Sequence, residues 1–229
     1  MPVGIITGAS RGLGRVTALA LAARGWDLVV DGRDAAALDR AVAEFRSRGG
    51  PGTQVLAVPG DVGEPSHRAT LARVARTLGP VDLLVNNAST LGPMPPLADY
   101  PLHRLASVLA VNVLAPLGLI QLLDSVDTVI NVSSDAAVEA YPNWGGYGAS
   151  KAALDHLSAV LAVERADLRV YAFDPGDMRT AMHQEAFPGE DISDRPEPET
   201  VVPALLRLVS ERPPSGRYRA SDLLAGVTA

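Results

Sequence analysis

Residues 3–14 read VGIITGASRGLG, a short apolar run followed by a turn with glycines at 8, 12 and 14. VGIIT has the length and β-branched content of a buried strand, and residues 15–24 have the apolar spacing of a helix. Glycine permits a tight turn and a close backbone approach, and free N–H groups at a helix N-terminus favour an anion. The stretch therefore predicts a strand–turn–helix unit that binds a nucleotide pyrophosphate, although a turn that needs glycine only for packing would read the same way.

The same alternation of strand and helix continues along the chain. Apolar strand-like runs lie at 28–30, 54–58, 81–85, 126–132, 168–173 and 216–220. Helical patterns lie between them, one capped by Asp34 and closed by Gly49, and others at 65–78, 102–123, 147–164 and about 200–210. Unbroken apolar strands alternating with helices predict an α/β fold, a doubly wound parallel sheet of about seven strands flanked by helices on both faces. We expect one domain over 1–229, with a lid-like loop at about 181–198.

Composition excludes several classes of protein. Of the 229 residues 47% are hydrophobic and 20% are charged, which allows a sizeable core and argues against disorder. The net charge of −6 argues against a nucleic-acid partner. The absence of cysteine excludes disulfides, thiolate zinc sites and a cysteine nucleophile. The histidines show no metal-ligand spacing, so we expect no metal; they are His67, His103, His156 and His183.

Neither a signal peptide nor a membrane span is expected. The N-terminus has no basic region followed by a long apolar one, which favours a cytoplasmic protein. Residues 105–123 carry no formal charge and approach the length of a membrane span. This segment contains Asn112, Pro116 and Gln121, so we predict a helix buried on several sides, with a subunit interface as one place for it.

A second group of polar residues follows the strand at 126–132. Tyr147 and Lys151 are four residues apart on a predicted helix and so share a face. A nearby ammonium favours the phenolate and should lower the pKa of Tyr147, which would suit acid–base chemistry. Ser134 follows the strand end at the same edge and could donate to a carbonyl oxygen. An ordinary solvated helix face is the alternative, but Lys151 is the only lysine among 20 basic residues.

Together these features resemble the short-chain dehydrogenase/reductase family, a Rossmann-like fold, over about residues 1–220. The matching motifs are TGASRGLG at 7–14, Asp61 with Val62, NNAS at 86–89, Asn112 in VNVLAP, Ser134, YGASK at 147–151, and Pro175–Gly176 with Thr180. Two features depart from the family pattern. Ser89 stands where the family has glycine, and the segment from Asn112 to Ser134 is several residues shorter than usual.

The resemblance implies hydride transfer between a nicotinamide cofactor and a carbonyl or alcohol. Ser134 would hold the substrate oxygen, Tyr147 would donate the proton, Lys151 would tune Tyr147 and bind the ribose, and Asn112 would hold a relay water. The cofactor would be bound by Gly8, Ser10, Arg11, Gly12, Leu13, Gly14, Arg33, Asp61, Val62, Asn87, Ala88, Tyr147, Lys151, Pro175, Gly176 and Thr180. The resemblance also implies a homodimer or homotetramer that pairs through helices 102–123 and 147–164.

The end of the second strand favours NADP over NAD. NAD enzymes commonly have an acidic residue at the end of this strand that binds the ribose 2′-hydroxyl. In this sequence that position is Gly32, and Arg33 follows it. Asp31 comes one residue early, so its side chain should point to the opposite face. We expect Arg33 and Arg11 to bind a 2′-phosphate. NAD remains the alternative if both arginines are solvated surface residues and Asp31 or Asp34 reaches the ribose.

The substrate should lie against Ser134, Trp144, Tyr147 and Met182, with Leu91 and Met94 as further candidates. No basic residue is obviously placed for an anionic substrate, so we predict a neutral, moderately apolar ketone or alcohol. A non-catalytic cofactor sensor or partner-binding protein on the same fold is the main alternative, because a fold does not fix a function. A third alternative is an epimerase or dehydratase on a related sheet, but such enzymes usually have an extra substrate domain, for which this chain has little room.

Overall fold

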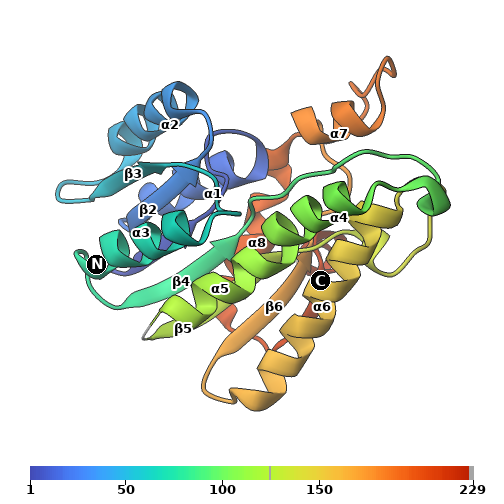
Figure 1. The fold of residues 1–229 in the computed structure, drawn as a ribbon. Coiled ribbons are helices and arrows are strands. Elements are labelled where there is room, and N and C mark those ends of the chain that lie inside the picture. Colours follow the sequence, from blue (N-terminus) through green and yellow to red (C-terminus); the bar gives the residue numbers. More distant parts are fainter. Residues whose placement is uncertain (124, 227–229) are drawn as a thin grey trace.

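The computed structural model describes residues 1–123 and 125–226, built around a seven-stranded parallel sheet (Figure 1). Across the sheet the strands run in the order β3-β2-β1-β4-β5-β6-β7. Their bounds are β1 Val3–Ile6, β2 Asp27–Gly32, β3 Val55–Pro59, β4 Val81–Asn86, β5 Val126–Val132, β6 Arg169–Asp174 and β7 Gly216–Arg219. The strand order reverses direction between β1 and β4, and such sheets bind ligands above the carboxyl ends at that point.

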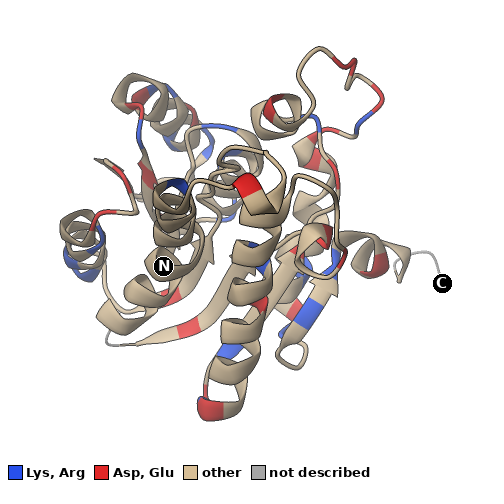
Figure 2. Ribbon diagram, turned by 45° about the vertical axis from the view of Figure 1, so that its right-hand side comes forward, with Lys and Arg blue, Asp and Glu red and all other residues tan. Residues whose placement is uncertain are grey.

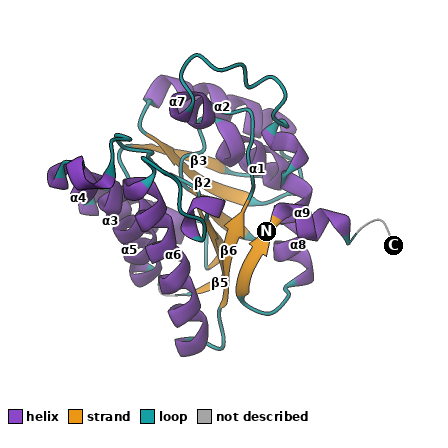
Figure 3. Cartoon of the chain, turned by 90° about the vertical axis from the view of Figure 1, so that its right-hand side faces the viewer, coloured by secondary structure: helices purple, strands orange, loops and turns teal. Residues whose placement is uncertain are grey.

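Helices cover both faces of the sheet (Figure 3). One layer contains α1 (Gly12–Ala22), α2 (Ala35–Arg48), α8 (Val202–Glu211) and α9 (Ala220–Ala225). The other contains α3 (Pro65–Arg76), α4 (Leu102–Leu109), α5 (Ala115–Leu122) and α6 (Gly145–Glu164). The predicted doubly wound α/β fold is therefore confirmed. Residues of both charges lie on the helices and loops around the sheet (Figure 2).

Alternation along the strands divides the core into two halves. Ile6, Val30 and Ile130 pack on the α1, α2 and α8 side. Ile5 and Val29 pack on the other side. All five are 0% exposed, which explains why these strands read as continuous apolar runs.

Local sequence signals set several element ends. Asp34 accepts a hydrogen bond from the backbone N–H of Ala37 at 3.0 Å and so caps α2. Gly25, with a φ of +78°, turns the chain from α1 into β2. Pro65 begins α3, where its missing N–H costs no hydrogen bond.

Three segments differ from the sequence prediction. The helix expected at 102–123 contains a π-helical turn at Ala110–Leu114. The predicted loop at 181–198 begins as a helix, α7 (Ala181–Ala186), because the Thr180 hydroxyl accepts from the N–H of His183 and caps it. The last strand stops at Arg219, and α9 begins directly after it. Of the predicted domain 1–229, residues 124 and 227–229 lie outside the described residues.

The apolar segment of the sequence is less enclosed than predicted. Within the described chain, Leu102–Leu122 is one helix long and apolar enough to cross a membrane by length and composition alone. Only 33% of its most apolar window is buried within the protomer. Leu102 and Leu114 are 79% and 55% exposed, so the helix is not buried on several sides by this chain itself.

Candidate active site

A cavity of about 630 Å³ runs along the carboxyl ends of the strands, from the glycine turn after β1 to Trp144 at the start of α6. Every predicted cofactor residue except Gly14 lines it. Of the predicted catalytic and substrate residues, Ser134, Trp144, Tyr147, Lys151 and Met182 line it, whereas Asn112 does not. The structure thus brings together predicted residues from seven separate parts of the sequence.

The glycine turn between β1 and α1 depends on glycine for two different reasons. Gly8 and Gly12 have φ values of +66° and +56°, a conformation that other residues rarely adopt. A Cβ on Gly14 would lie 2.5 Å from the Gly8 carbonyl oxygen and 2.4 Å from Nδ2 of Asn87. Gly14 is therefore required for packing behind the turn, which explains its absence from the cavity wall.

Residues of β4 and the loop after it hold the turn from behind. The Thr7 hydroxyl accepts from the backbone N–H groups of Asn87 and Ala88 at 3.0 and 2.9 Å. Nδ2 of Asn87 donates to the carbonyl oxygens of Thr7 and Gly8 at 2.9 and 3.1 Å. The N-terminus of α1 is thereby fixed at the cavity, and the first N–H groups of a helix, which have no partner within it, can bind an anion. This cradle fits the pyrophosphate of a dinucleotide cofactor.

The two acids near the end of β2 already have partners within the protein. Asp31 is 1% exposed, its Oδ1 accepts from the N–H of Gly8 at 2.6 Å, and its Oδ2 lies 3.1 Å from Nε2 of His67. Asp34 caps α2, and Gly32 between them has no side chain to offer a ribose. Asp31 is therefore engaged within the protein, whereas Asp34, which is exposed and lines the cavity, uses one carboxylate oxygen for its cap.

Two arginines remain available at this end of the cavity. Arg11 and Arg33 line it, and both are exposed. Neither guanidinium makes a hydrogen bond or ion pair with residues 1–123 or 125–226. Unpaired guanidinium groups beside a phosphate-binding turn suit a further phosphate group.

The opposite end of the cavity is built from buried polar side chains. Tyr147 and Lys151 are 8% and 2% exposed, and Nζ of Lys151 donates to the Val132 carbonyl oxygen at 2.7 Å. Nζ lies 5.5 Å from the centre of the Tyr147 ring. The Ser134 hydroxyl, at the end of β5, donates to Oδ1 of Asp135 at 2.9 Å. The three predicted groups thus meet at the sheet edge.

The expected lowering of the Tyr147 pKa by Lys151 is wrong for the free protein. Burial raises the pKa of Tyr147 to about 12, and this outweighs hydrogen bonds from Ser134 and Ser89 that lower it. Burial also lowers the pKa of Lys151 to about 8, against an opposing effect of Asp155. At neutral pH the phenol therefore holds its proton and can donate it, beside an ammonium that is still charged.

Asn112 lies beside the site with its side chain fully engaged. Its Oδ1 accepts from the N–H of Thr90 at 2.9 Å and the hydroxyl of Ser89 at 3.2 Å. Its Nδ2 donates to the Thr90 carbonyl and the Ser150 hydroxyl, each at 2.9 Å. The side chain therefore ties the loop after β4 to α6 and has no spare polar atom with which to hold the predicted relay water.

An apolar cluster surrounds Tyr147. The rings of Trp144 and Tyr147 meet edge to face at 5.8 Å, and Phe187 lies 5.9 Å from Trp144. Leu91 and Met182 belong to the same cluster, the latter from α7. Of the predicted substrate residues, Trp144, Tyr147 and Met182 therefore lie in one apolar cluster, and α7 contributes Met182 to it.

Sequence reasoning missed several polar residues at this end. Ser89 was noted only as a departure from the glycine of the family pattern, yet its hydroxyl contacts both Asn112 and Tyr147. Asp155 lies four residues after Lys151 on the same helix face, so its spacing was a usable signal. Arg217 contacts the Ser134 carbonyl from 83 residues away, and no local pattern indicates such a contact.

The comparisons with known proteins agree with this geometry. The family model for short chain dehydrogenase matches residues 2–191. The chain belongs to the short-chain dehydrogenase/reductase family. It is accordingly an NAD(P)-dependent oxidoreductase that acts on carbonyl or alcohol groups of small molecules.

Individual relatives cover nearly the whole chain. L-xylulose reductase of Homo sapiens is 34% identical, over 96% of this chain and 92% of its own. Sepiapterin reductase of Xenopus laevis is 32% identical, over 93% and 83%. A Shigella flexneri structure described as a short chain dehydrogenase complexed with NADP has a TM-score of 0.88 and 28% identity, covering 96% of this chain and 97% of that one. The two named reductases act on different substrates, so the family leaves this chain's substrate open.

Proposed function

We propose that this enzyme reduces a neutral, apolar ketone with NADPH, and that Tyr147 is the proton donor. The observation that carries this proposal is the buried, protonated phenol beside the only lysine of the chain, at the reaction end of the cavity. When bound, the nicotinamide supplies the hydride. The protein supplies the proton, the orientation of the carbonyl and the exclusion of water.

Each polar side chain at the reaction end has a separate proposed role. Ser134 turns its hydroxyl from Asp135 to the substrate oxygen, and Tyr147 donates its proton to the same atom. Lys151 remains charged near neutral pH and stabilises the phenolate that this donation leaves. Asn112 is a positioning residue that holds the loop after β4 against α6, so a relay water would have to be held by other groups.

The preference for NADP rests on charge. Arg11 and Arg33 are unpaired within the described residues and can bind a 2′-phosphate, whereas Asp31 is buried against Gly8 and His67 and one oxygen of Asp34 caps α2. An NAD enzyme would need one of these acids for the ribose hydroxyl. The NADP complex of the Shigella flexneri neighbour supports the same choice.

The proposed substrate class rests on the cavity wall formed by Leu91, Trp144 and Met182, with the ring of Phe187 packed against Trp144. An aromatic wall of this kind favours a flat or bulky apolar substituent on the ketone. The carboxylate of Asp135 near the reacting groups disfavours an anionic substrate.

Initial rates of NADPH and NADH oxidation with a panel of carbonyls test the proposal. The panel contains aromatic ketones, aliphatic ketones, sugars and keto acids. We expect the highest kcat/KM with aromatic ketones and NADPH. Tight NADPH binding without turnover on any carbonyl would instead identify a cofactor-sensing protein.

We also propose a cytoplasmic homodimer or homotetramer. Leu114 on the α4–α5 segment and Val160 and Val163 on α6 are 55%, 39% and 84% exposed, which leaves an apolar surface for a second copy. Light scattering on the purified protein gives the number of copies. A monomeric mass at micromolar concentration would contradict this part of the proposal.

A further inference from the structure

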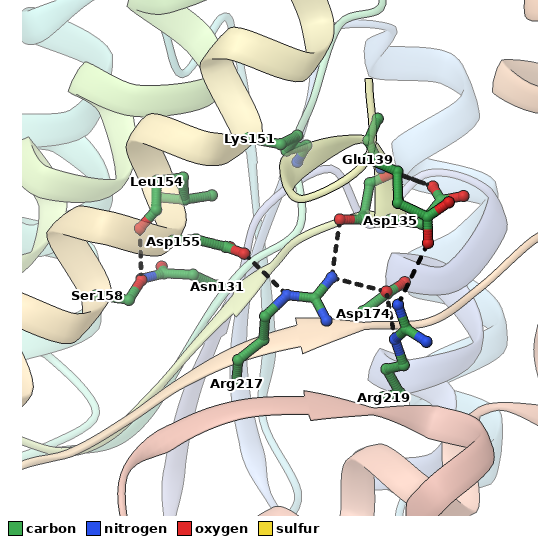
Figure 4. Close-up of polar contacts among 12 residues, drawn as sticks. Asn131, Asp135, Glu139, Lys151, Leu154, Asp155, Ser158, Asp174, Arg217 and Arg219 are labelled. Atoms are coloured by element: carbon green, nitrogen blue, oxygen red, sulfur yellow. Dashed lines mark hydrogen bonds and ion pairs between the residues drawn. The ribbon is translucent and has the colours of Figure 1, made fainter. Parts of the chain in front are cut away.

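One arginine on the edge strand joins three parts of the reaction end (Figure 4). Nε of Arg217, on β7, lies 3.0 Å from Oδ2 of Asp155 on α6. Its Nη2 lies 2.8 Å from Oδ2 of Asp174 at the end of β6. The same Nη2 donates to the carbonyl oxygen of Ser134 at 3.0 Å. A single guanidinium therefore contacts α6, the end of β6 and the end of β5.

Each of these contacts lies next to a functional group. Asp155 is four residues from Lys151 on one helix face. Asp174 precedes Pro175 and Gly176, which line the cavity, and its Oδ1 accepts from the N–H of Gly176 at 3.0 Å. The third contact is made to the backbone of Ser134 itself. The planar fork of an arginine can hold such a set in fixed directions, whereas a lysine ammonium cannot.

The network is largely shielded from water. The side chains of Asp174, Asp155 and Arg217 are 4%, 15% and 25% exposed. Oδ1 of Asp155 is buried and has no hydrogen-bond partner within the described residues. Carboxylates this buried need a nearby positive charge, and Arg217 is the partner that both share.

We propose that Arg217 is a positioning residue for the reaction: it fixes the Ser134 backbone, the loop that begins at Asp174 and the Lys151 helix in one arrangement. The proposal rests on the roles assigned to Ser134 and Lys151 under the proposed function. Arg217 should also have an electrostatic effect on the site, because its positive charge offsets the negative charges of Asp155 and Asp174.

That effect has a defined sign. Asp155 raises the pKa of Lys151, and Asp174 and Asp135 raise that of Tyr147. Loss of Arg217 leaves these carboxylates less compensated, so the pKa of Lys151 should rise. Loss of the negative charge of Asp155 should lower the pKa of Lys151. Arg219, 3.8 Å from Asp174, remains in both variants and limits the size of the change.

The single lysine permits a direct measurement in the free protein. With ¹³C-lysine labelling, one Cε resonance reports the titration of Lys151, whose midpoint we expect at about pH 8. In Arg217→Gln the midpoint should move up, and in Asp155→Asn down, each by about half a unit or more. Arg165→Gln is the matched control, since it removes an exposed ion pair with Asp167 at the far end of α6.

Kinetics then test the positioning itself. Arg217→Lys keeps the charge but not the fork, so kcat should fall about tenfold while the KM for NADPH changes less than about threefold. If Arg217→Gln does not fold, Asp155→Asn and Arg217→Lys still decide the question. Absence of turnover in the wild type would count against the proposed function. The Cε resonance of Lys151 would still test the Arg217 network in that case, because its measurement needs no turnover. Midpoints in Arg217→Gln and Asp155→Asn that coincide with the wild type would overturn the proposal.

Discussion

The phosphate end of the cavity, formed by the glycine turn with Arg11 and Arg33, is made largely of main chain. The proposed reaction end, formed by Ser134, Tyr147 and Lys151, is made of side chains, of which Tyr147 and Lys151 are buried. At the first end the two cations are exposed and unpaired within the described chain. At the second, the charged side chains are largely buried and tied to the protein. Changes at the phosphate end should therefore alter cofactor affinity, and changes at the reaction end should alter turnover.

After loss of the Tyr147 hydroxyl, the largest effect is expected for Lys151→Arg. The guanidinium keeps the charge, but its planar shape does not fit a site that is 2% exposed and built around one ammonium donor. We expect kcat to fall by about a hundredfold or more, with NADPH still bound. Steady-state kinetics and cofactor fluorescence measure the two quantities. Near-native turnover would show that the reaction end does not depend on a compact ammonium.

The second prediction concerns pH. Below about pH 8 Lys151 is charged, and Tyr147, whose pKa is about 12, holds its proton. The kcat/KM for NADPH in the reducing direction should be level below about pH 8 and should fall about tenfold per unit above it. A profile that rises through pH 8 would contradict the charged lysine as the active form.

The third prediction addresses the phosphate end. Arg33→Ala should raise the KM for NADPH by about 10- to 100-fold, as expected for loss of a charge-assisted contact to phosphate. The KM for NADH should change little, because that cofactor has no 2′-phosphate. Arg48→Ala, an exposed arginine of α2 outside the cavity wall, is the control. Equal increases in the KM for NADPH and the KM for NADH would show that Arg33 does not contact the 2′-phosphate.

The smallest effect is expected for Trp144→Leu. This change removes the edge-to-face contact with Tyr147 but keeps an apolar surface. The KM for an aromatic ketone should rise about three- to tenfold, and that for a small aliphatic ketone should not. Parallel measurements on the two ketones test whether the wall selects the substrate.

The two ends also differ in how far sequence alone could predict them. The spacing of the glycines was enough to predict the turn at 7–14. Gly8 and Gly12 are needed there for their backbone conformation, and Gly14 is needed because a side chain would not fit. Spacing was also enough to place Tyr147 and Lys151 on one helix face. The central strands were readable from short apolar runs such as Val3–Ile6 and residues 28–30, which are buried.

What could not be predicted depends on contacts between distant residues. Asp31 supports the turn from below with His67, 36 residues away, so its carboxylate is unavailable to a ribose. The pKa of Tyr147 rises because of burial, which spacing does not report. Helix α7 lies in a segment that the sequence indicates as loop, although the cap from Thr180 to His183 was a local signal that could have been used.

The replacement Tyr147→Phe tests the central claim most directly, because it removes one hydroxyl and keeps the ring against Trp144. The rate of NADPH oxidation with an aromatic ketone is measured for both proteins, with NADPH binding as the check that the site is intact. We expect at least about a thousandfold loss of kcat with binding retained, as general acid catalysis by one phenol requires. Turnover within tenfold of the wild type would show that another group donates the proton.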